Sequence, residues 1–198
     1  MTTRRDLAGT TAALATRAKA GDREAAGRLF ALAADRARLY VRLRLGPSLR
    51  QRVDVDDVLQ DGWAEATRSL ASFEPRGEGA FVRWLCRILE NRIRDLGDRE
   101  TARKRTPDAA FVRVSEIASH AAGPKSGAAG AAARAEEEVR LVRAVDALPD
   151  DEREVVLRRF FEHRTLDEIA ALTGQGETTV RRLLGRALRR LGSALGDA

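Results

Sequence analysis

The acidic residues of segment 54–65 are the first in the chain whose types and spacing could do chemistry. This segment contains five acids and no base. Asp54, Asp57 and Asp61 recur every three or four residues, so they share one face of a helix. Paired carboxylates could hold a metal ion or act in acid–base catalysis, as in a metal-dependent nuclease. Because like charges at this spacing repel one another, the same face is also suited to binding a basic partner.

A calcium-binding loop is excluded by Val58, because the fifth position of such a loop needs an oxygen ligand.

Arginines near the C-terminus form a second constellation, which suits phosphate binding. Residues 177–190 hold five Arg and one acid, whereas residues 136–168 hold 11 acids and 6 bases. Thr165 and Glu168 have the spacing of a capping box at the start of a helix, and a glycine-rich turn separates this helix from the next one. The pattern predicts a helix-turn-helix, whose second helix presents its first residues to base edges. Its outer face carries Thr178, Arg181, Arg182, Arg186 and Arg189.

A third, basic face follows the acidic segment, on a helix predicted from Ala80 to about Arg99. Residues 81–105 hold eight bases and four acids, and a loop rich in Pro and Gly carries Phe73 just before them. An aromatic ring beside arginines can bind single-stranded nucleic acid, because bases stack on the ring while phosphates pair with Arg. The polar side of the predicted helix carries Arg83, Arg87, Asn91 and Arg94.

Apolar residues at helical spacing predict the elements that position these faces. They recur every three or four positions from Leu7 to about Leu45, with a break near Gly21. Gly46-Pro47-Ser48 is predicted to end that stretch. The acidic face belongs to a helix from about Asp54 to Leu70, whose other side is apolar.

The second half of the chain begins after a segment without periodicity. Residues 103–135 are low in complexity and predict a flexible linker. Two helices then precede the helix-turn-helix, and no strand pattern is present. The expected fold is all-α, with two small helical domains, residues 1–102 and 136–198, joined by the linker.

Composition limits the remaining function classes. The 198 residues include 36 Lys and Arg against 30 Asp and Glu, and the pI near 10.5 predicts attraction to polyanions. A single cysteine, Cys86, excludes an intrachain disulfide and a cysteine-rich zinc site, and two histidines leave little for a metal centre or a triad. We therefore expect no metal and no cofactor.

The cellular location can also be predicted. No window approaches the roughly 18 apolar residues of a transmembrane helix, so no membrane insertion is expected. The pair Arg4-Arg5 resembles a twin-arginine export signal, but the residues after it are weakly apolar and are expected to form a helix. A cytoplasmic location is the prediction.

The ordered motifs resemble those of a known family. Segments 54–63, 73–77 and 81–91 are similar to the second conserved domain of bacterial RNA polymerase sigma factors of the extracytoplasmic-function group. Segment 148–161 and the helix-turn-helix resemble the fourth domain of the same group. The resemblance covers about residues 10–100 and 136–195.

This resemblance implies a function for each face. In such factors, which are not enzymes, the acidic helix binds the β′ subunit of core RNA polymerase. The loop and basic helix open and hold the −10 promoter element, and the second helix of the helix-turn-helix reads the −35 element. Further contacts with the β subunit and an anti-sigma protein are also implied. The residues concerned are Asp57, Gln60 and Asp61 for polymerase; Phe73, Arg76, Arg83, Arg87, Asn91 and Arg94 for the −10 element; and Thr178, Thr179, Arg181, Arg182 and Arg186 for the −35 element.

The promoter sequence and three alternative functions stay open at this point. Leu183 and Gly185 stand where family members often carry Arg or His, which leaves the promoter sequence open. A stand-alone helix-turn-helix regulator is an alternative, although it has no need of the acidic face. A metal-dependent nuclease and a regulator that has lost promoter opening are further alternatives.

Overall fold

The computed structural model describes residues 4–75, 79–104 and 128–196, and all the regular elements in these ranges are helices. The prediction of an all-α fold is therefore confirmed. The elements are α1 (Arg4–Lys19), α2 (Arg23–Arg50), α3 (Val55–Ser69), a short 3₁₀ helix η1 (Leu70–Ser72), α4 (Ala80–Lys104), α5 (Ala128–Asp146), α6 (Asp150–Phe160), α7 (Leu166–Thr173) and α8 (Glu177–Gly196). None of the described helices is long and apolar enough to cross a membrane.

The breaks between the first helices lie where the sequence predicts them. Gly21 separates α1 from α2 with a φ of 93°, a conformation that residues with a side chain rarely adopt. Asp22 then caps α2, because its carboxylate accepts a hydrogen bond from the Ala25 N–H at 2.9 Å. At Gly46 the helical path is interrupted at φ 66°, but one more helical turn follows before α2 ends at Arg50.

Helices α1 to α4 pack around one apolar cluster. Tyr40, Phe81 and Leu29 are among its largest fully buried side chains. Gly62 lets α3 lie close to α4, since a Cβ there would be 2.4 Å from the Leu89 side chain. The apolar side of α3 is thus fixed against the cluster, and its acidic side is left at the surface.

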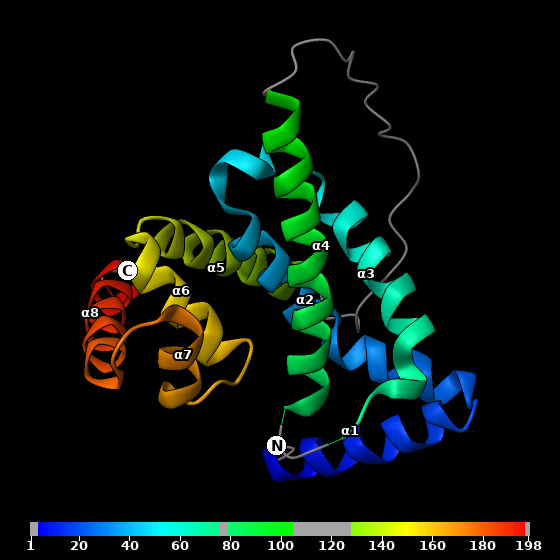
Figure 1. Ribbon diagram of the computed structural model, residues 1–198. Helices are drawn as coiled ribbons and strands as arrows, with labels where there is room; N and C mark the ends of the chain where they lie inside the picture. Colours follow the sequence, from blue (N-terminus) through cyan, green and yellow to red (C-terminus); the bar gives the residue numbers. More distant parts are fainter. Residues whose placement is uncertain (1–3, 76–78, 105–127, 197–198) are drawn as a thin grey trace.

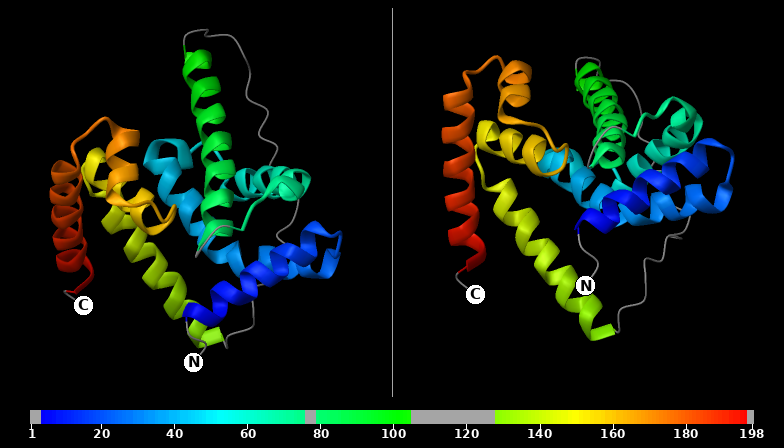
Figure 2. Two further views of the ribbon diagram at one scale, coloured as in Figure 1. Left: turned by 60° about the horizontal axis from the view of Figure 1, so that its bottom comes forward. Right: turned by 90° about the horizontal axis from the view of Figure 1, so that it is seen from below.

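Helices α5 to α8 pack around smaller apolar clusters. Val155 on α6, Ile169 on α7 and Val180 on α8 belong to one of them, and each is at most 1% exposed. A second cluster joins the turn between α5 and α6 to α6 and α8 through Leu148, Val156 and Ala187. Figure 2 shows α7 and α8 beside α6, on the far side of the molecule from α3.

The two halves of the chain are in direct contact. Figure 1 shows α2 and α4 in the middle, with α3 on one side and α5 to α8 on the other. Leu43 of α2 is 1% exposed, and it packs with Val142 and Val145 of α5 and Leu157 of α6. Helix α2 therefore contributes to the cores of both halves.

The start of α5 differs from the predicted boundary. The sequence places the second domain at residue 136, whereas α5 already begins at Ala128. Alanine is a good helix former. An alanine-rich stretch lacks the amphipathic spacing from which a helix is predicted, so the sequence assigns this part of α5 to the linker. The linker is predicted over residues 103–135; residues 103–104 and 128–135 are helical, and residues 105–127 lie outside the described part of the chain.

Candidate nucleic-acid interface

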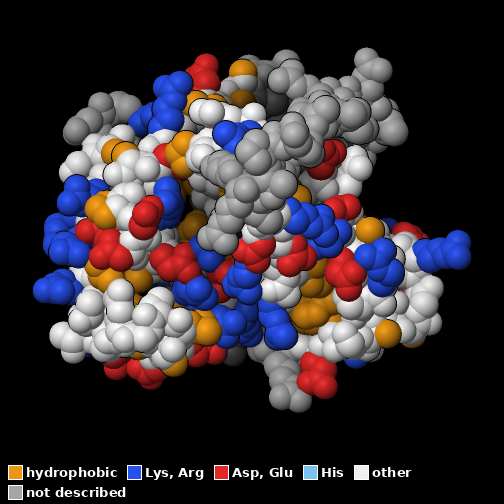
Figure 3. Space-filling view, turned by 45° about the horizontal axis from the view of Figure 1, so that its top comes forward, with side chains coloured by type: hydrophobic (Ala, Val, Ile, Leu, Met, Phe, Trp, Pro, Cys, Tyr) orange, Lys and Arg blue, Asp and Glu red, His pale blue; other side chains and the backbone are white. Residues whose placement is uncertain are grey.

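Arginines and acidic residues are interspersed over the surface of the molecule, as Figure 3 shows for one face. Many arginines pair with carboxylates of other helices, so the charge count of a segment does not reveal which arginines are available to a ligand. We therefore describe each predicted surface by the contacts of its side chains.

The helix-turn-helix is built as the sequence predicts. The Thr165 hydroxyl accepts a hydrogen bond from the Glu168 N–H at 3.2 Å, and the Glu168 carboxylate accepts one from the Thr165 N–H at 2.9 Å. The hydrogen bond from the Thr165 backbone, with help from Arg164, lowers the pKa of Glu168. Helix α7 ends at Gly174, whose φ of 68° allows the tight turn into α8.

The first turns of α8 are directed to solvent. Val180 and Leu183 are buried against α6 and α7, which orients the opposite face outward. Thr178, Arg181 and Arg182 are exposed on that face, and Thr179 is half-buried. Arg181 pairs with Glu177 one turn earlier. This is the placement that a helix-turn-helix requires of the residues that contact DNA.

Arg186 lies further along α8 and has a partner inside the chain. Its Nε is 3.0 Å from a carboxylate oxygen of Glu152 on α6, and Arg190 approaches the second oxygen at 3.1 Å. Glu152 is only 1% exposed, so its charge needs these partners. The sequence predicts Arg186 as a −35 contact, and its pairing with Glu152 was not foreseen. In the structure, the ion pair of Arg186 with Glu152 links α8 to α6.

Leu183 explains one departure from the family pattern. It is 2% exposed in the cluster between α6, α7 and α8. A basic residue at this position of the present chain would place a charge in an apolar core.

Some carboxylates on the acidic face of α3 bond to other groups of the chain, and several are exposed to solvent. Asp54 caps the helix by accepting a hydrogen bond from the Asp56 N–H at 2.8 Å. Asp57, Gln60 and Asp61 are all exposed on one side of α3. Asp61 pairs with Arg92 of α4 at 2.8 Å, yet its side chain is still 62% exposed. Within the ranges that the structure describes, no three His, Cys, Asp or Glu side chains gather as a metal site would require.

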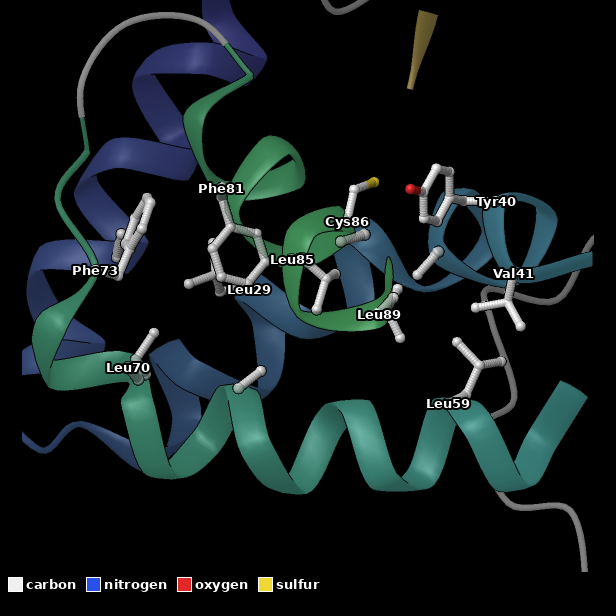
Figure 4. Packing of buried hydrophobic residues seen from close by; sticks show 14 of the residues in the cluster. Leu29, Tyr40, Val41, Leu59, Leu70, Phe73, Phe81, Leu85, Cys86 and Leu89 are labelled. Carbon is white, nitrogen blue, oxygen red and sulfur yellow. The ribbon is translucent and has the colours of Figure 1, made fainter. Parts of the chain in front are cut away.

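Phe73 does not stand at the surface as the stacking prediction requires. It is 2% exposed, and its ring packs 5.6 Å from that of Phe81 and 5.2 Å from that of Trp84. Figure 4 shows it in the apolar cluster beside Phe81. A base could stack on Phe73 only if the ring left this core, and the role of Phe73 at the −10 element stays a prediction. The turn after η1 directs the ring inward, which the Pro- and Gly-rich sequence did not indicate.

The other −10 candidates follow α4. Arg87, Asn91 and Arg94 are exposed, and Arg94 pairs with Glu90 at 3.1 Å. Arg83 is half-buried, and its guanidinium donates to the His163 carbonyl at 3.4 Å. Arg76 lies outside the described residues.

These features define a helical protein with a helix-turn-helix and an exposed acidic helix face, and comparison with known proteins places it in a family. The chain matches the family models Sigma-70 region 2 over residues 32–103 and Sigma-70, region 4 over residues 138–191. It is 31% identical over 193 residues to the RNA polymerase sigma factor CnrH of Cupriavidus metallidurans, covering 93% of each chain. It is 33% identical over 141 residues to the ECF RNA polymerase sigma-E factor of Escherichia coli K12, covering 68% of this chain and 70% of that protein.

Solved structures show the same fold. The structure of CnrH in complex with the cytosolic domain of CnrY superimposes with a TM-score of 0.54 at 27% identity, covering 96% of this chain and 99% of that one. The sigma factor RpoE in complex with the anti-sigma factor NepR, from Bartonella quintana, gives a TM-score of 0.52 at 20% identity, over 86% of this chain and 96% of that one.

The chain therefore belongs to the RNA polymerase sigma factors of the extracytoplasmic-function group. It is an alternative sigma factor that directs transcription initiation, and this decides against the interpretation as a stand-alone regulator.

Proposed function

We propose that this sigma factor divides its work among three surfaces. The exposed side of α3 binds core RNA polymerase, the polar side of α4 holds the −10 element, and the first turns of α8 read the −35 element. Residues 1–102 and 136–198 act as the two working domains, joined by residues 103–135. The contacts are assigned to Asp57, Gln60 and Asp61 on α3; to Arg83, Arg87, Asn91 and Arg94 on α4, with Phe73 and Arg76 before it; and to Thr178, Thr179, Arg181, Arg182 and Arg186 on α8.

One observation carries the polymerase assignment. Asp57, Gln60 and Asp61 are exposed on one side of α3, while Val58 and Leu59 on its other side are at most 4% exposed. The helix is thus fixed by its apolar side, and its acidic side is free to bind a basic surface. A stand-alone DNA-binding protein would gain nothing from such a face, because it repels phosphate.

Co-elution with bacterial core RNA polymerase on a sizing column tests this assignment. We expect the wild-type chain to co-elute and the Asp61→Arg variant to elute separately, with an unchanged helical circular-dichroism spectrum. Glu137→Arg is the matched control, because it makes the same charge reversal at an exposed position of α5. Equal binding of all three proteins would refute the role of the α3 face.

We further propose that the chain is a non-catalytic subunit that works in the cytoplasm, where core polymerase and promoter DNA are found. CnrH was solved with the cytosolic domain of CnrY, and RpoE with an anti-sigma factor. By analogy, an anti-sigma protein is a further partner of this chain. Co-purification of the tagged chain from its host, followed by mass spectrometry, tests for such a partner.

A further inference from the structure

One line of residues runs along the outer face of α8. Thr178, Arg182, Gly185 and Arg189 follow one another at steps of four, three and four positions, so they lie nearly in line along the helix axis. Arg182 and Arg189 are exposed, and Gly185 between them is half-buried. Figure 2 shows α8 at the edge of the molecule, with one side turned away from the other helices.

The five arginines of α8 differ in whether the chain supplies them with a carboxylate. Three of them pair with Glu177 or with the buried Glu152, and these are Arg181, Arg186 and Arg190. Within the described ranges, Arg182 and Arg189 have no such partner. A guanidinium binds a phosphate with the same forked geometry as a carboxylate, so the two unpaired arginines are suited to an external anion.

The Arg189 side chain runs back along α8 to Gly185. A Cβ placed on Gly185 would lie 3.7 Å from Nη1 of Arg189. Long side chains on a helix point toward its N-terminus, which explains why a residue four positions later reaches this place. Because glycine lets a ligand approach the backbone closely, the guanidinium lies directly beside a point where a DNA strand can approach α8.

The position of Arg189 along α8 indicates which part of DNA it meets. In a helix-turn-helix, the first residues of the second helix reach base edges in the major groove. At about 1.5 Å per residue, Arg189 lies about 16 Å farther along the axis than Thr178, whereas the major groove is about 8.5 Å deep. With the N-terminus of α8 in the groove, a guanidinium at this level meets phosphates rather than base edges.

We propose that Gly185 and Arg189 form a phosphate-binding site on α8, which holds the DNA backbone beside the −35 element. This inference rests on the proposed −35 role of α8. The two unpaired arginines then have different tasks, because base contacts specify a sequence and phosphate contacts position the protein on it. The DNA supplies Arg189 with the negative charge that the chain supplies to Arg181, Arg186 and Arg190.

Holoenzyme made from the full-length chain and core polymerase tests this site on duplex DNA. One DNA carries a promoter selected from a random library, and the other differs from it by one base pair in the −35 element. The variants are Arg189→Ala, Gly185→Leu and, as a control, Arg28→Ala, which removes an exposed arginine from α2. Mobility shifts at several salt concentrations measure the affinity and its salt dependence, and circular dichroism measures the helix content.

We expect Arg189→Ala to weaken binding about fivefold, by the same factor on both DNAs. The slope of log affinity against log salt concentration should become shallower by about 0.9, because one phosphate contact is lost. Gly185→Leu should cause a similar loss, since its side chain displaces the guanidinium and keeps the DNA backbone away. Arg28→Ala should bind as the wild type does.

Three results would overturn the proposal. An Arg189→Ala variant with the affinity and salt dependence of the control would exclude a phosphate contact. Unequal losses on the two DNAs would show that Arg189 reads a base. Wild-type affinity of Gly185→Leu would show that the space at Gly185 has no role in binding.

Arg182→Ala, measured in parallel, reports on the −35 role of α8 itself. It should weaken binding to the selected promoter. If Arg182→Ala binds both DNAs as the wild type does, the proposed role of α8 fails. A loss seen with Arg182→Ala but not with Arg189→Ala overturns only the phosphate-binding site.

Discussion

The first turns of α4 and α8 carry similar arginines, yet their surroundings differ. Arg181 and Arg182 are exposed at the start of α8, because the buried contacts of that helix lie on its other face. Arg83 at the start of α4 is half-buried and bonded to the loop between α6 and α7. Two basic surfaces of similar composition thus differ in their availability to DNA.

The difference shows that the exposure of a predicted DNA-binding surface depends on residues far away in the sequence. Helix α8 is packed by α5, α6 and α7, and its first outer turn lies outside that packing. The start of α4 is instead shared between its own core and a segment far along the sequence. We expect the −35 surface to be exposed in the free protein, whereas the −10 surface is partly covered at the start of α4.

The largest effect should come from removing the support of α8. Leu183→Ala leaves a cavity among Val155, Ile169 and Val180, and we expect it to lower the free energy of unfolding of the C-terminal helices by about 2–5 kcal/mol. Denaturant unfolding followed by circular dichroism measures this loss. Unchanged stability together with altered promoter preference would show that Leu183 contacts DNA rather than the core.

The next effect concerns the contact between α2 and α6. Hydrogen bonding and attraction from Arg44, with Arg158 adding to them, outweigh burial and lower the pKa of Glu154 below 4.5. Glu154 therefore stabilises the contact between α2 and α6 near neutral pH, and this contribution is lost as the pH falls through the lowered pKa. Glu154→Gln should lower the free energy of unfolding by about 3 kcal/mol at pH 7, and by less in acid. Denaturant unfolding at pH 7 and in acid measures the loss, and a variant as stable as the wild type would contradict it.

A smaller effect is expected for Arg182, which is exposed at the start of α8. Arg182→Ala should weaken binding of the holoenzyme to a promoter selected from a random DNA library by about 1–3 kcal/mol. Binding to core polymerase should not change, because Arg182 lies on α8 and far from the α3 face in the chain. Electrophoretic mobility shifts and co-elution measure the two quantities. Parallel loss of both would refute the division of labour between α3 and α8.

The smallest effect is expected at Glu162, where a substitution should increase stability rather than lower it. Burial raises the pKa of Glu162 above 4.5, and the negative charge of Glu90 raises it further. A raised pKa means that the folded protein favours the protonated carboxyl, a preference that stabilises the fold in acid and is lost as the pH rises through the raised pKa. Glu162→Gln should therefore increase the free energy of unfolding at pH 7 by on the order of 1 kcal/mol.

This gain should shrink as the pH falls through the raised pKa of Glu162, because the wild-type carboxyl then becomes protonated in the folded protein. The groups that face Glu162 are Tyr40 and Arg44 on α2, Cys86 and Glu90 on α4, Arg158 on α6, and Arg164 in the loop. Thermal unfolding of the variant and the wild type across this pH range measures the difference. A variant less stable than the wild type at pH 7 would show that attraction by Arg158 and Arg164 dominates.

Much of the helical framework could be predicted, because its signals are local. The capping box of Thr165 and Glu168, the cap at Asp54 and the break at Gly21 each involve residues within four positions of one another. The buried side of α3 and the exposed side of α8 follow from the helical repeat. These features also placed Asp57, Asp61 and Arg182 at the surface.

Other site residues could not be placed from their neighbours in sequence. Phe73 is buried because the turn after η1 brings it onto Phe81 and Trp84. Arg186 has a partner, Glu152, on a different helix. Neither contact has a periodicity or a motif that a reading of the sequence could detect.

The sequence by itself determined the helices, their buried sides and the family. Only the tertiary structure decided which charged groups are free, since Tyr40 meets Glu162 across 122 positions and Arg44 meets Glu154 across 110. Helix caps and amphipathic repeats are set by hydrogen bonds and solvation within a few residues. The pairing of buried charges depends instead on how whole helices pack, and no local pattern specifies that packing.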